Sequence, residues 1–265
     1  MAYAINPLDG TRIYYEDDGG EGVPLVLHGG FLDSVIDVRE SSLARALPVG
    51  EFRTIYVDHR GLGRSDKPHD PTAFAMPLRV ADAVAVVDEL ALTRAHFVGM
   101  SWGARLAFGI GEHAPERVLS LVALGQQPYA WPDSPITRAV TDGLVVSRTE
   151  GAEGVVEALE AFWGVRFPEP RRDRWLANDP VALEAAWSAV LAEGAVSDDL
   201  TRWRVPCLIC IGSGDADFIE QARQAAHEIP GAQIVELGSA DHYQAHISED
   251  EVLRDAVLSS LRANS

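Results

Sequence analysis

The chain has 265 residues, 47% of them hydrophobic, which is enough for one large domain or two small ones with a substantial core. Its 22 Lys and Arg against 40 Asp and Glu give a formal net charge of −18, which disfavours binding to nucleic acid or to anionic membranes. No apolar run reaches the roughly 18 residues of a membrane-spanning helix, and the N-terminal stretch lacks the features of a signal peptide. We therefore expect a cytoplasmic protein without nucleic-acid or membrane partners.

The N-terminal segments predict the antiparallel edge of a sheet. Residues 3–8 and 11–17 have the composition of strands, and the Asp9-Gly10 dipeptide between them is typical of a hairpin turn. Residues 24–27 form a short apolar run, as expected for a strand buried on both faces, and lead directly into His28-Gly29-Gly30-Phe31. Because glycine lets the backbone approach a ligand closely, this loop either borders a site or forms a tight turn.

A second glycine-rich loop follows the next strand. Residues 53–58 predict that strand, and residues 58–66 then read D-H-R-G-L-G-R-S-D. The loop lacks the Gly-Lys-[Ser/Thr] ending of a phosphate-binding loop, so we assign no chemistry to it. The apolar spacing over residues 77–92 predicts a helix that carries the chain to the next strand.

Residues 95–113 carry the most informative pattern in the chain. An apolar strand is followed by Gly99-Met100-Ser101-Trp102-Gly103 and then by a helix rich in Ala, Leu and Phe. A serine at such a sharp turn projects its hydroxyl above the sheet edge, and the crowded backbone requires small residues two positions to either side. Gly99 and Gly103 meet that requirement, so the pattern indicates that Ser101 is a nucleophile.

Residues 126–203 interrupt the alternation of strands and helices. They follow a strand at residues 118–124, and they contain helical patterns, notably at 152–163 and 180–193, with several prolines between them. Five of the six tryptophans fall in or at the end of this segment: Trp131, Trp163, Trp175, Trp187 and Trp203. We expect a small helical unit whose aromatic side chains either roof an apolar pocket or pack its own short helices.

The strand pattern resumes at residues 205–212, which contain both cysteines. Cys207 and Cys210 are three residues apart, on opposite faces of a strand, and this favours buried free thiols over a redox or metal pair. The strand leads into Ser213-Gly214-Asp215, which places a carboxylate just past its end.

The C-terminal part of the sequence places a histidine just past a predicted strand, as Asp215 is just past the strand before it. Residues 219–229 predict a helix and residues 233–237 a last strand, after which residues 238–243 read G-S-A-D-H-Y. His242 therefore lies just past the last strand. Asp241 precedes it, and its carboxylate would raise the histidine pKa if it faced inward; we expect it to face solvent.

The sequence resembles the α/β-hydrolase fold family in the His-Gly loop, the D-x-R-G-x-G-x-S loop, the G-x-S-x-G elbow and the chain order Ser, Asp, His. The resemblance implies an α/β protein with a mostly parallel eight-stranded sheet flanked by helices. It places the core domain at residues 1–125 and 204–265, and a helical cap at 126–203, inserted after strand six.

The resemblance also implies a catalytic triad. Ser101 would be the nucleophile, His242 the general base, and Asp215 the carboxylate that fixes the imidazole. Asp217 is an alternative acid if the strand ends later, and His246 an alternative base one helical turn on. Only His242 occupies the position directly after the last strand.

Two backbone N–H groups would form the oxyanion hole: that of Trp102, and one from the His-Gly loop, with Gly30 the first candidate and Phe31 the second. Phe31, Trp102, Trp131 and Trp163 are the expected substrate-binding side chains. No metal or other cofactor is required. Serine at the elbow argues against epoxide hydrolases and haloalkane dehalogenases, which use an aspartate there.

By resemblance, the expected function is a serine hydrolase acting on a carboxylic ester or lactone of a small, fairly apolar compound. Three alternatives share these motifs: a cofactor-free perhydrolase, a hydrolase of carbon–carbon bonds, and a small-molecule receptor with vestigial turnover. The expected partner is the small-molecule substrate, and the protein would be a monomer or a homodimer.

Overall fold

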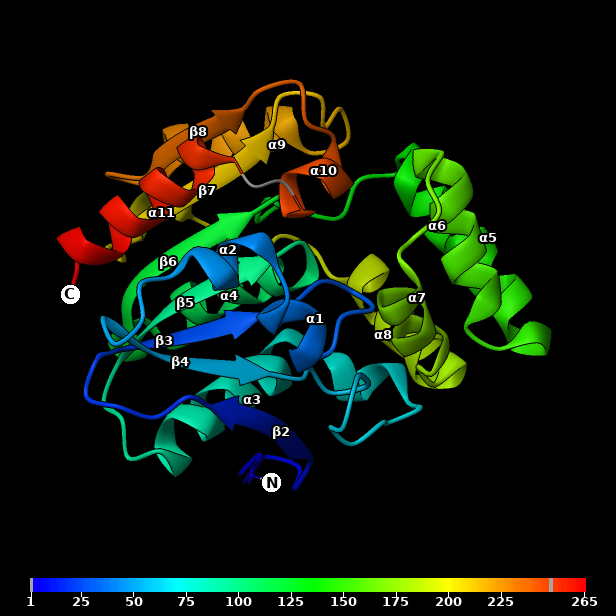
Figure 1. Ribbon diagram of the computed structural model, residues 1–265, viewed down its shortest axis with the longest axis horizontal. Helices are drawn as coiled ribbons and strands as arrows, with labels where there is room; N and C mark the ends of the chain where they lie inside the picture. Colours follow the sequence, from blue (N-terminus) through cyan, green and yellow to red (C-terminus); the bar gives the residue numbers. More distant parts are fainter. Residues whose placement is uncertain (1, 248–249) are drawn as a thin grey trace.

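The computed structural model describes residues 2–247 and 250–265, without the side chains of residues 246 and 247. Its framework is one eight-stranded sheet with the strand order β1-β2-β4-β3-β5-β6-β7-β8 (Figure 1). The strands are β1 (Ala2–Ile5), β2 (Arg12–Asp17), β3 (Val23–His28), β4 (Phe52–Val57), β5 (Ala95–Met100), β6 (Val118–Leu124), β7 (Cys207–Gly212) and β8 (Gln233–Leu237).

The N-terminal hairpin forms an antiparallel edge, as predicted. Strand β1 pairs antiparallel with β2, and β2 pairs antiparallel with β4, while every pairing from β4 to β8 is parallel. In the centre of the sheet His28 is in register with both Val57 and Gly99. The carboxyl ends of β3, β4 and β5 therefore meet at one edge, which is where open parallel sheets bind their ligands.

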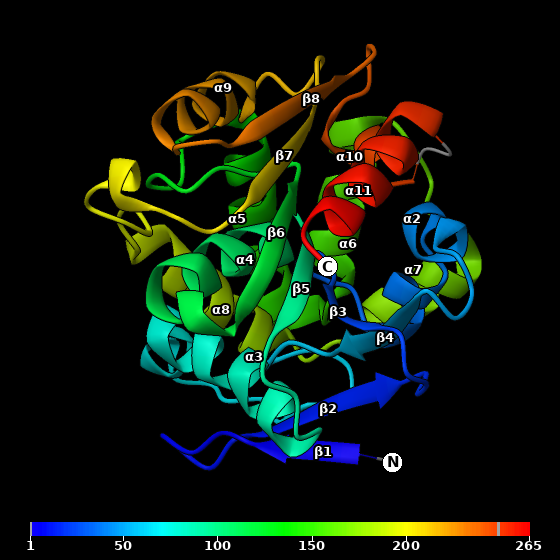
Figure 2. The ribbon, with the colours of Figure 1, turned by 90° about the vertical axis from the view of Figure 1, so that its left-hand side faces the viewer.

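Helices cover both faces of the sheet (Figure 2). One face carries α3 (Met76–Glu89), α4 (Trp102–His113) and α9 (Ile219–Glu228), and the other carries α1 (Val35–Arg39), α2 (Ser42–Ala46), α10 (His242–Ile247) and α11 (Glu251–Ala263). Helix α3 ends three residues before the predicted limit of 92, because Ala91 adopts a left-handed φ of 54°.

The two cysteines illustrate how the strands face both layers. Cys207 packs in the apolar cluster beneath α3, α4 and α9, whereas Cys210 packs in the cluster on the opposite face. Both are free and buried, as predicted, and burial raises each thiol pKa to about 12. Thiols with so high a pKa are unreactive near neutral pH.

Four helices lie between β6 and β7: α5 (Pro135–Glu150), α6 (Glu153–Trp163), α7 (Glu169–Leu176) and α8 (Pro180–Ala192). They stand beyond the carboxyl ends of the central strands (Figure 1), and we call them the cap helices. The patterns at 152–163 and 180–193 correspond to α6 and α8. The limits of the cap at residues 126 and 203 stay a prediction.

A buried arginine attaches both ends of this segment to the core. Arg105 on α4 donates to the carbonyl of Tyr129 at 2.7 Å and to the carbonyl of Gly194 at 2.8 Å. Its Nε also lies 3.3 Å from the Glu193 carboxylate, which is shared with buried Arg79. Charged hydrogen bonds of this kind are strong when shielded from water. They therefore hold the chain in place where it enters the cap helices and where it leaves them.

Within the described residues no helix is long and apolar enough to cross a membrane.

Candidate active site

The turn between β5 and α4 holds Ser101 in a strained conformation. Its φ of 51° and ψ of −108° are unusual for a residue with a side chain, and its N–H donates to the Leu124 carbonyl at 2.8 Å. The flanking glycines make the turn possible. A Cβ on Gly99 would lie 2.0 Å from the Gly103 carbonyl oxygen, and a Cβ on Gly103 would lie 2.6 Å from the His28 carbonyl oxygen.

Two further side chains from distant strand ends meet this serine. Nε2 of His242 lies 2.9 Å from the Ser101 hydroxyl oxygen, and its Nδ1 lies 2.8 Å from Oδ2 of Asp215. Asp215 follows β7, and His242 is the first residue of α10 rather than part of a loop. These distances suit an imidazole that donates its Nδ1–H to the carboxylate and accepts the serine proton at Nε2.

The neighbouring acids occupy other positions. Asp217 lies two residues beyond Asp215, and burial together with the Asp215 charge raises its pKa. Asp241 accepts the Gln244 N–H at 2.7 Å in an exposed hydrogen bond. The side chain of His246, the alternative base, lies outside the described residues. Asp215 is thus the carboxylate hydrogen-bonded to His242.

The candidate oxyanion-hole donors differ in their hydrogen bonds. The Gly30 N–H, the first candidate for the oxyanion hole, donates to Oδ2 of Asp33 at 2.8 Å. Asp33 itself donates its backbone N–H to the Gly30 carbonyl at 3.2 Å, so the two residues close a tight turn. Within the described residues the N–H groups of Phe31 and Trp102 have no acceptor. These two N–H groups are therefore available to a ligand oxygen, whereas that of Gly30 is already paired.

The second glycine-rich loop supports the first. Oδ1 of Asp58 accepts the Val35 N–H at 2.6 Å and Oδ2 accepts the Arg64 N–H at 2.7 Å. His59 contacts the Gly29 carbonyl through Nε2 at 3.0 Å, and burial lowers its pKa to about 4. A neutral His59 can donate to that carbonyl without bringing a buried charge beneath the site. Arg60 is tied to Asp82 at 2.6 Å.

The triad opens into a cavity of about 90 Å³ between the sheet edge and the cap helices. The predicted substrate-binding residues Phe31, Trp102, Trp131 and Trp163 all line it. Four further aromatic residues that were not assigned to the site complete the lining: Trp175, Trp187, Phe218 and Tyr243. The tryptophan content of the cap segment was a signal for the first two. Phe218 and Tyr243 directly follow the acid and base regions, and no sequence pattern marked them.

Seven of these eight aromatic rings pack against another ring of the set, and Trp175 is linked to Tyr243 through Phe167. We call the eight side chains the aromatic belt. Phe31 lies between Trp102 and Trp187, with ring centroids 5.1 and 5.3 Å away. Trp131 continues the belt, at 5.3 Å from Trp187 and 5.6 Å from Phe218.

The belt returns to the triad on the other side. The His242 ring lies 5.2 Å from Phe218 and stacks parallel to Trp163 at 6.4 Å. Trp163 in turn stacks on Tyr243 at 5.3 Å. His242 is thus packed between aromatic rings, which hold its orientation and limit the water around it.

Within the described part of the chain, no group of three or more His, Cys, Asp and Glu side chains could hold a metal ion. The residues that converge on the cavity are those of acyl transfer: a serine with a hydrogen-bonded base, an acid behind the base, and two N–H donors.

Residues 23–156 match the family described as the alpha/beta hydrolase fold, and this segment is just over half of the 265 residues. The chain belongs to the α/β-hydrolase fold family. The non-heme chloroperoxidase of Streptomyces lividans is 27% identical, over 98% of this chain and 99% of its own length.

Two solved structures share the α/β-hydrolase fold over the whole chain. The enol-lactonase of Burkholderia xenovorans superimposes with a TM-score of 0.80 at 24% identity, covering 98% of this chain and all of the lactonase. A thermophilic esterase from Thermogutta terrifontis gives a TM-score of 0.81 at 24% identity, covering 100% of this chain and 99% of the esterase. At this identity the likeness concerns the fold alone. The family relatives include esterases, a lactonase and a peroxidase.

Proposed function

We propose that this α/β-hydrolase is a serine hydrolase that cleaves a carboxylic ester or lactone of a small, fairly apolar compound. The observation that carries the proposal is the unbroken chain of hydrogen bonds from Asp215 through His242 to Ser101, at 2.8 and 2.9 Å, at the base of an aromatic cavity. The cavity of about 90 Å³ favours short acyl groups.

In the proposed mechanism, His242 takes the hydroxyl proton of Ser101 as the oxygen attacks the substrate carbonyl. Asp215 stabilises the imidazolium that forms. The N–H groups of Phe31 and Trp102 bind the oxyanion, each contributing roughly 3 kcal/mol to transition-state stabilisation. His242 then protonates the leaving alcohol, and a water molecule activated by the same histidine releases the acid from Ser101.

Hydrolysis of p-nitrophenyl esters from acetate to octanoate by the wild type and by Ser101→Ala tests this proposal. We expect turnover by the wild type, with a preference for the short chains, and a loss of about 10⁶-fold in kcat for the variant. A fluorophosphonate should label Ser101 covalently. Equal background rates in both proteins, with no labelling, would contradict the mechanism.

A perhydrolase is the second candidate, because the chloroperoxidase of Streptomyces lividans matches nearly the whole chain. In that reaction hydrogen peroxide replaces water at the acyl-enzyme, so the products are a peracid and free Ser101. Peroxide-dependent bromination in acetate buffer measures this activity. A peracid yield exceeding the acid yield at millimolar peroxide would favour the second candidate over the first.

A further inference from the structure

One side of the active-site cavity is charged, in contrast to the aromatic belt around it. The charged residues that line this side are Asp33, Asp37 and Arg171. Asp33 follows the oxyanion loop, Asp37 lies on α1, and Arg171 comes from α7 of the cap. A second guanidinium, that of Arg174 on α7, also contacts Asp37.

Asp37 and Asp33 differ in how their charges are compensated. Oδ1 of Asp37 lies 2.7 Å from the Arg174 guanidinium and 3.7 Å from that of Arg171, so this carboxylate is paired. Asp33 accepts its two hydrogen bonds from neutral groups, the Gly30 N–H at 2.8 Å and the Trp175 indole N–H at 3.2 Å. Among the described residues no Lys or Arg lies within ion-pair distance of Asp33.

The Asp33 carboxylate can be reached by a ligand, and the charge of Arg171 compensates it only in part. Asp33 retains accessible surface and lines the same cavity as Ser101. Burial raises the pKa of Asp33, which shows that its surroundings do not fully compensate the charged form. A carboxylate has about four lone-pair positions, and only two are used here. A ligand cation would form the direct ion pair that Asp33 lacks.

The surroundings of Asp33 also suit a cation. The indole of Trp175 bonds to Asp33, and Trp163 and Tyr243 line the same cavity. Aromatic faces attract alkylammonium groups by roughly 0.5 to 2 kcal/mol each. Arg171 is already engaged: its Nε lies 3.7 Å from Oδ1 of Asp37, and its guanidinium stands over the Trp175 ring at 5.7 Å. The formal net charge of −18 attracts cations to the protein as a whole.

We propose that the substrate of this protein carries an alkylammonium group, held by the aromatic belt and paired with Asp33. This inference rests on the proposed hydrolase function, which it deepens by assigning the substrate class. The reaction is unchanged: Ser101 acylates and water releases the acid, while the ammonium group binds without reacting.

Two acetate esters of matched shape test the proposal: acetylcholine and 3,3-dimethylbutyl acetate. Acetylcholine has a positively charged nitrogen at the position where the other ester has a neutral carbon. We expect kcat/KM for the choline ester to exceed that for the neutral ester by at least about tenfold, corresponding to about 1.4 kcal/mol. In Asp33→Asn this ratio should fall by about tenfold. The asparagine oxygen still accepts one hydrogen bond, and thermal unfolding checks that the variant folds.

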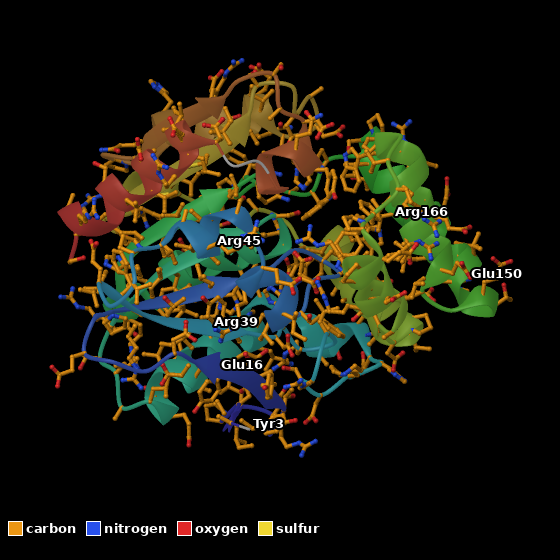
Figure 3. The ribbon with its side chains drawn as sticks, viewed as in Figure 1. Tyr3, Glu16, Arg39, Arg45, Glu150 and Arg166 are labelled. Atoms are coloured by element: carbon orange, nitrogen blue, oxygen red, sulfur yellow. The ribbon has the colours of Figure 1, made fainter. Side chains whose placement is uncertain are left out.

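Glu150→Gln is the matched control. Glu150 is exposed at the outer end of cap helix α5, far from the sheet edge (Figure 3), so this variant removes the same charge outside the cavity. The ester ratio should not change. The proposal would be overturned if the wild type had similar kcat/KM values for the two esters, or if Glu150→Gln lowered their ratio as much as Asp33→Asn. A preference for an acetate ester with a carboxylate in place of the ammonium group would also overturn it.

Binding separates this inference from the function on which it rests. Calorimetry with Ser101→Ala measures the affinity for choline and for 3,3-dimethylbutanol without turnover. We expect Ser101→Ala to bind choline more tightly than 3,3-dimethylbutanol, and the Ser101→Ala, Asp33→Asn double variant to lose this preference. That result supports the inference even if neither ester is hydrolysed and the hydrolase function fails. Hydrolysis of both esters with equal affinity for the two alcohols would leave the function standing and refute the inference.

Discussion

The two walls of the active site are built in different ways. The triad wall consists of three candidate catalytic residues, Ser101, Asp215 and His242. Each lies one to five residues past the end of a strand and is positioned by backbone geometry. The cap wall consists of side chains such as Trp131 and Trp187, which are positioned mainly by contact with one another. Chemistry therefore depends on main-chain turns that tolerate little change, whereas specificity depends on side chains that can be exchanged.

The largest effect should come from the triad wall. Asp215→Asn should lower kcat for p-nitrophenyl acetate by about 10⁴-fold, because the amide favours the wrong imidazole tautomer while leaving the geometry intact. Steady-state kinetics measures this loss. Asp217→Asn, which removes the neighbouring carboxylate, should cost less than about tenfold. Equal losses would make Asp217 part of the triad.

The elbow glycines should be the most sensitive positions for stability. Gly99→Ala places a Cβ 2.0 Å from the Gly103 carbonyl oxygen, a backbone atom that cannot move aside easily. We expect a loss of about 3 kcal/mol or more in the free energy of unfolding, measured in urea. Gly194→Ala serves as the control, because nothing lies within 4 Å of its added Cβ. If both variants unfold alike, the turn is looser than its geometry implies.

Burial of His59, which contacts the Gly29 carbonyl, predicts that the free energy of unfolding depends on pH. The pKa of His59 is about 4 in the folded protein against 6.5 in the unfolded chain, because burial disfavours the charged ring. Its contribution to stability is therefore complete above pH 6.5 and is lost as the pH falls through about 4, amounting to about 3 kcal/mol in total. Imidazole ¹⁵N shifts follow this titration directly. A His59 midpoint near 6.5 would rule it out.

The smallest effect should come from the cap wall. Trp131→Phe keeps an aromatic ring but removes the indole N–H bonded to Thr137 and opens space beside Trp187. We expect the preferred acyl chain to lengthen, with ratios of kcat/KM between esters changing by about tenfold or less. Trp203→Phe changes a tryptophan that packs on Phe108, outside the cavity. Altered chain preference in Trp203→Phe would contradict this division of roles.

Local pattern accounts for most of the fold. The spacing of apolar residues located β6 and β8 at their observed limits, residues 118–124 and 233–237. It also placed Ser101, Asp215 and His242 just after strands. Because carboxyl ends of parallel strands share one edge, residues in that position are brought together even when far apart in the sequence. The sequence could not show that α10 begins at His242, since helix starts lack a reliable signal.

The oxyanion loop shows where sequence reasoning stops. The glycines of residues 28–31 identified the loop, and its first donor was expected to be Gly30. Only the folded chain shows that Asp33 turns back onto the Gly30 N–H. Which of several neighbouring N–H groups stays unpaired depends on dihedral angles over a few residues, and composition does not specify these.

By itself, the sequence determined the α/β-hydrolase architecture and the three residues of the candidate triad, because both follow from short motifs at strand ends. Tertiary structure alone decided which side chains line the cavity. Phe218 and Tyr243 join the belt by contact with residues from other segments, and Asp33 lacks an ion-pair partner although Arg171 lines the same cavity. Such contacts arise from the packing of distant elements, and no local pattern records them.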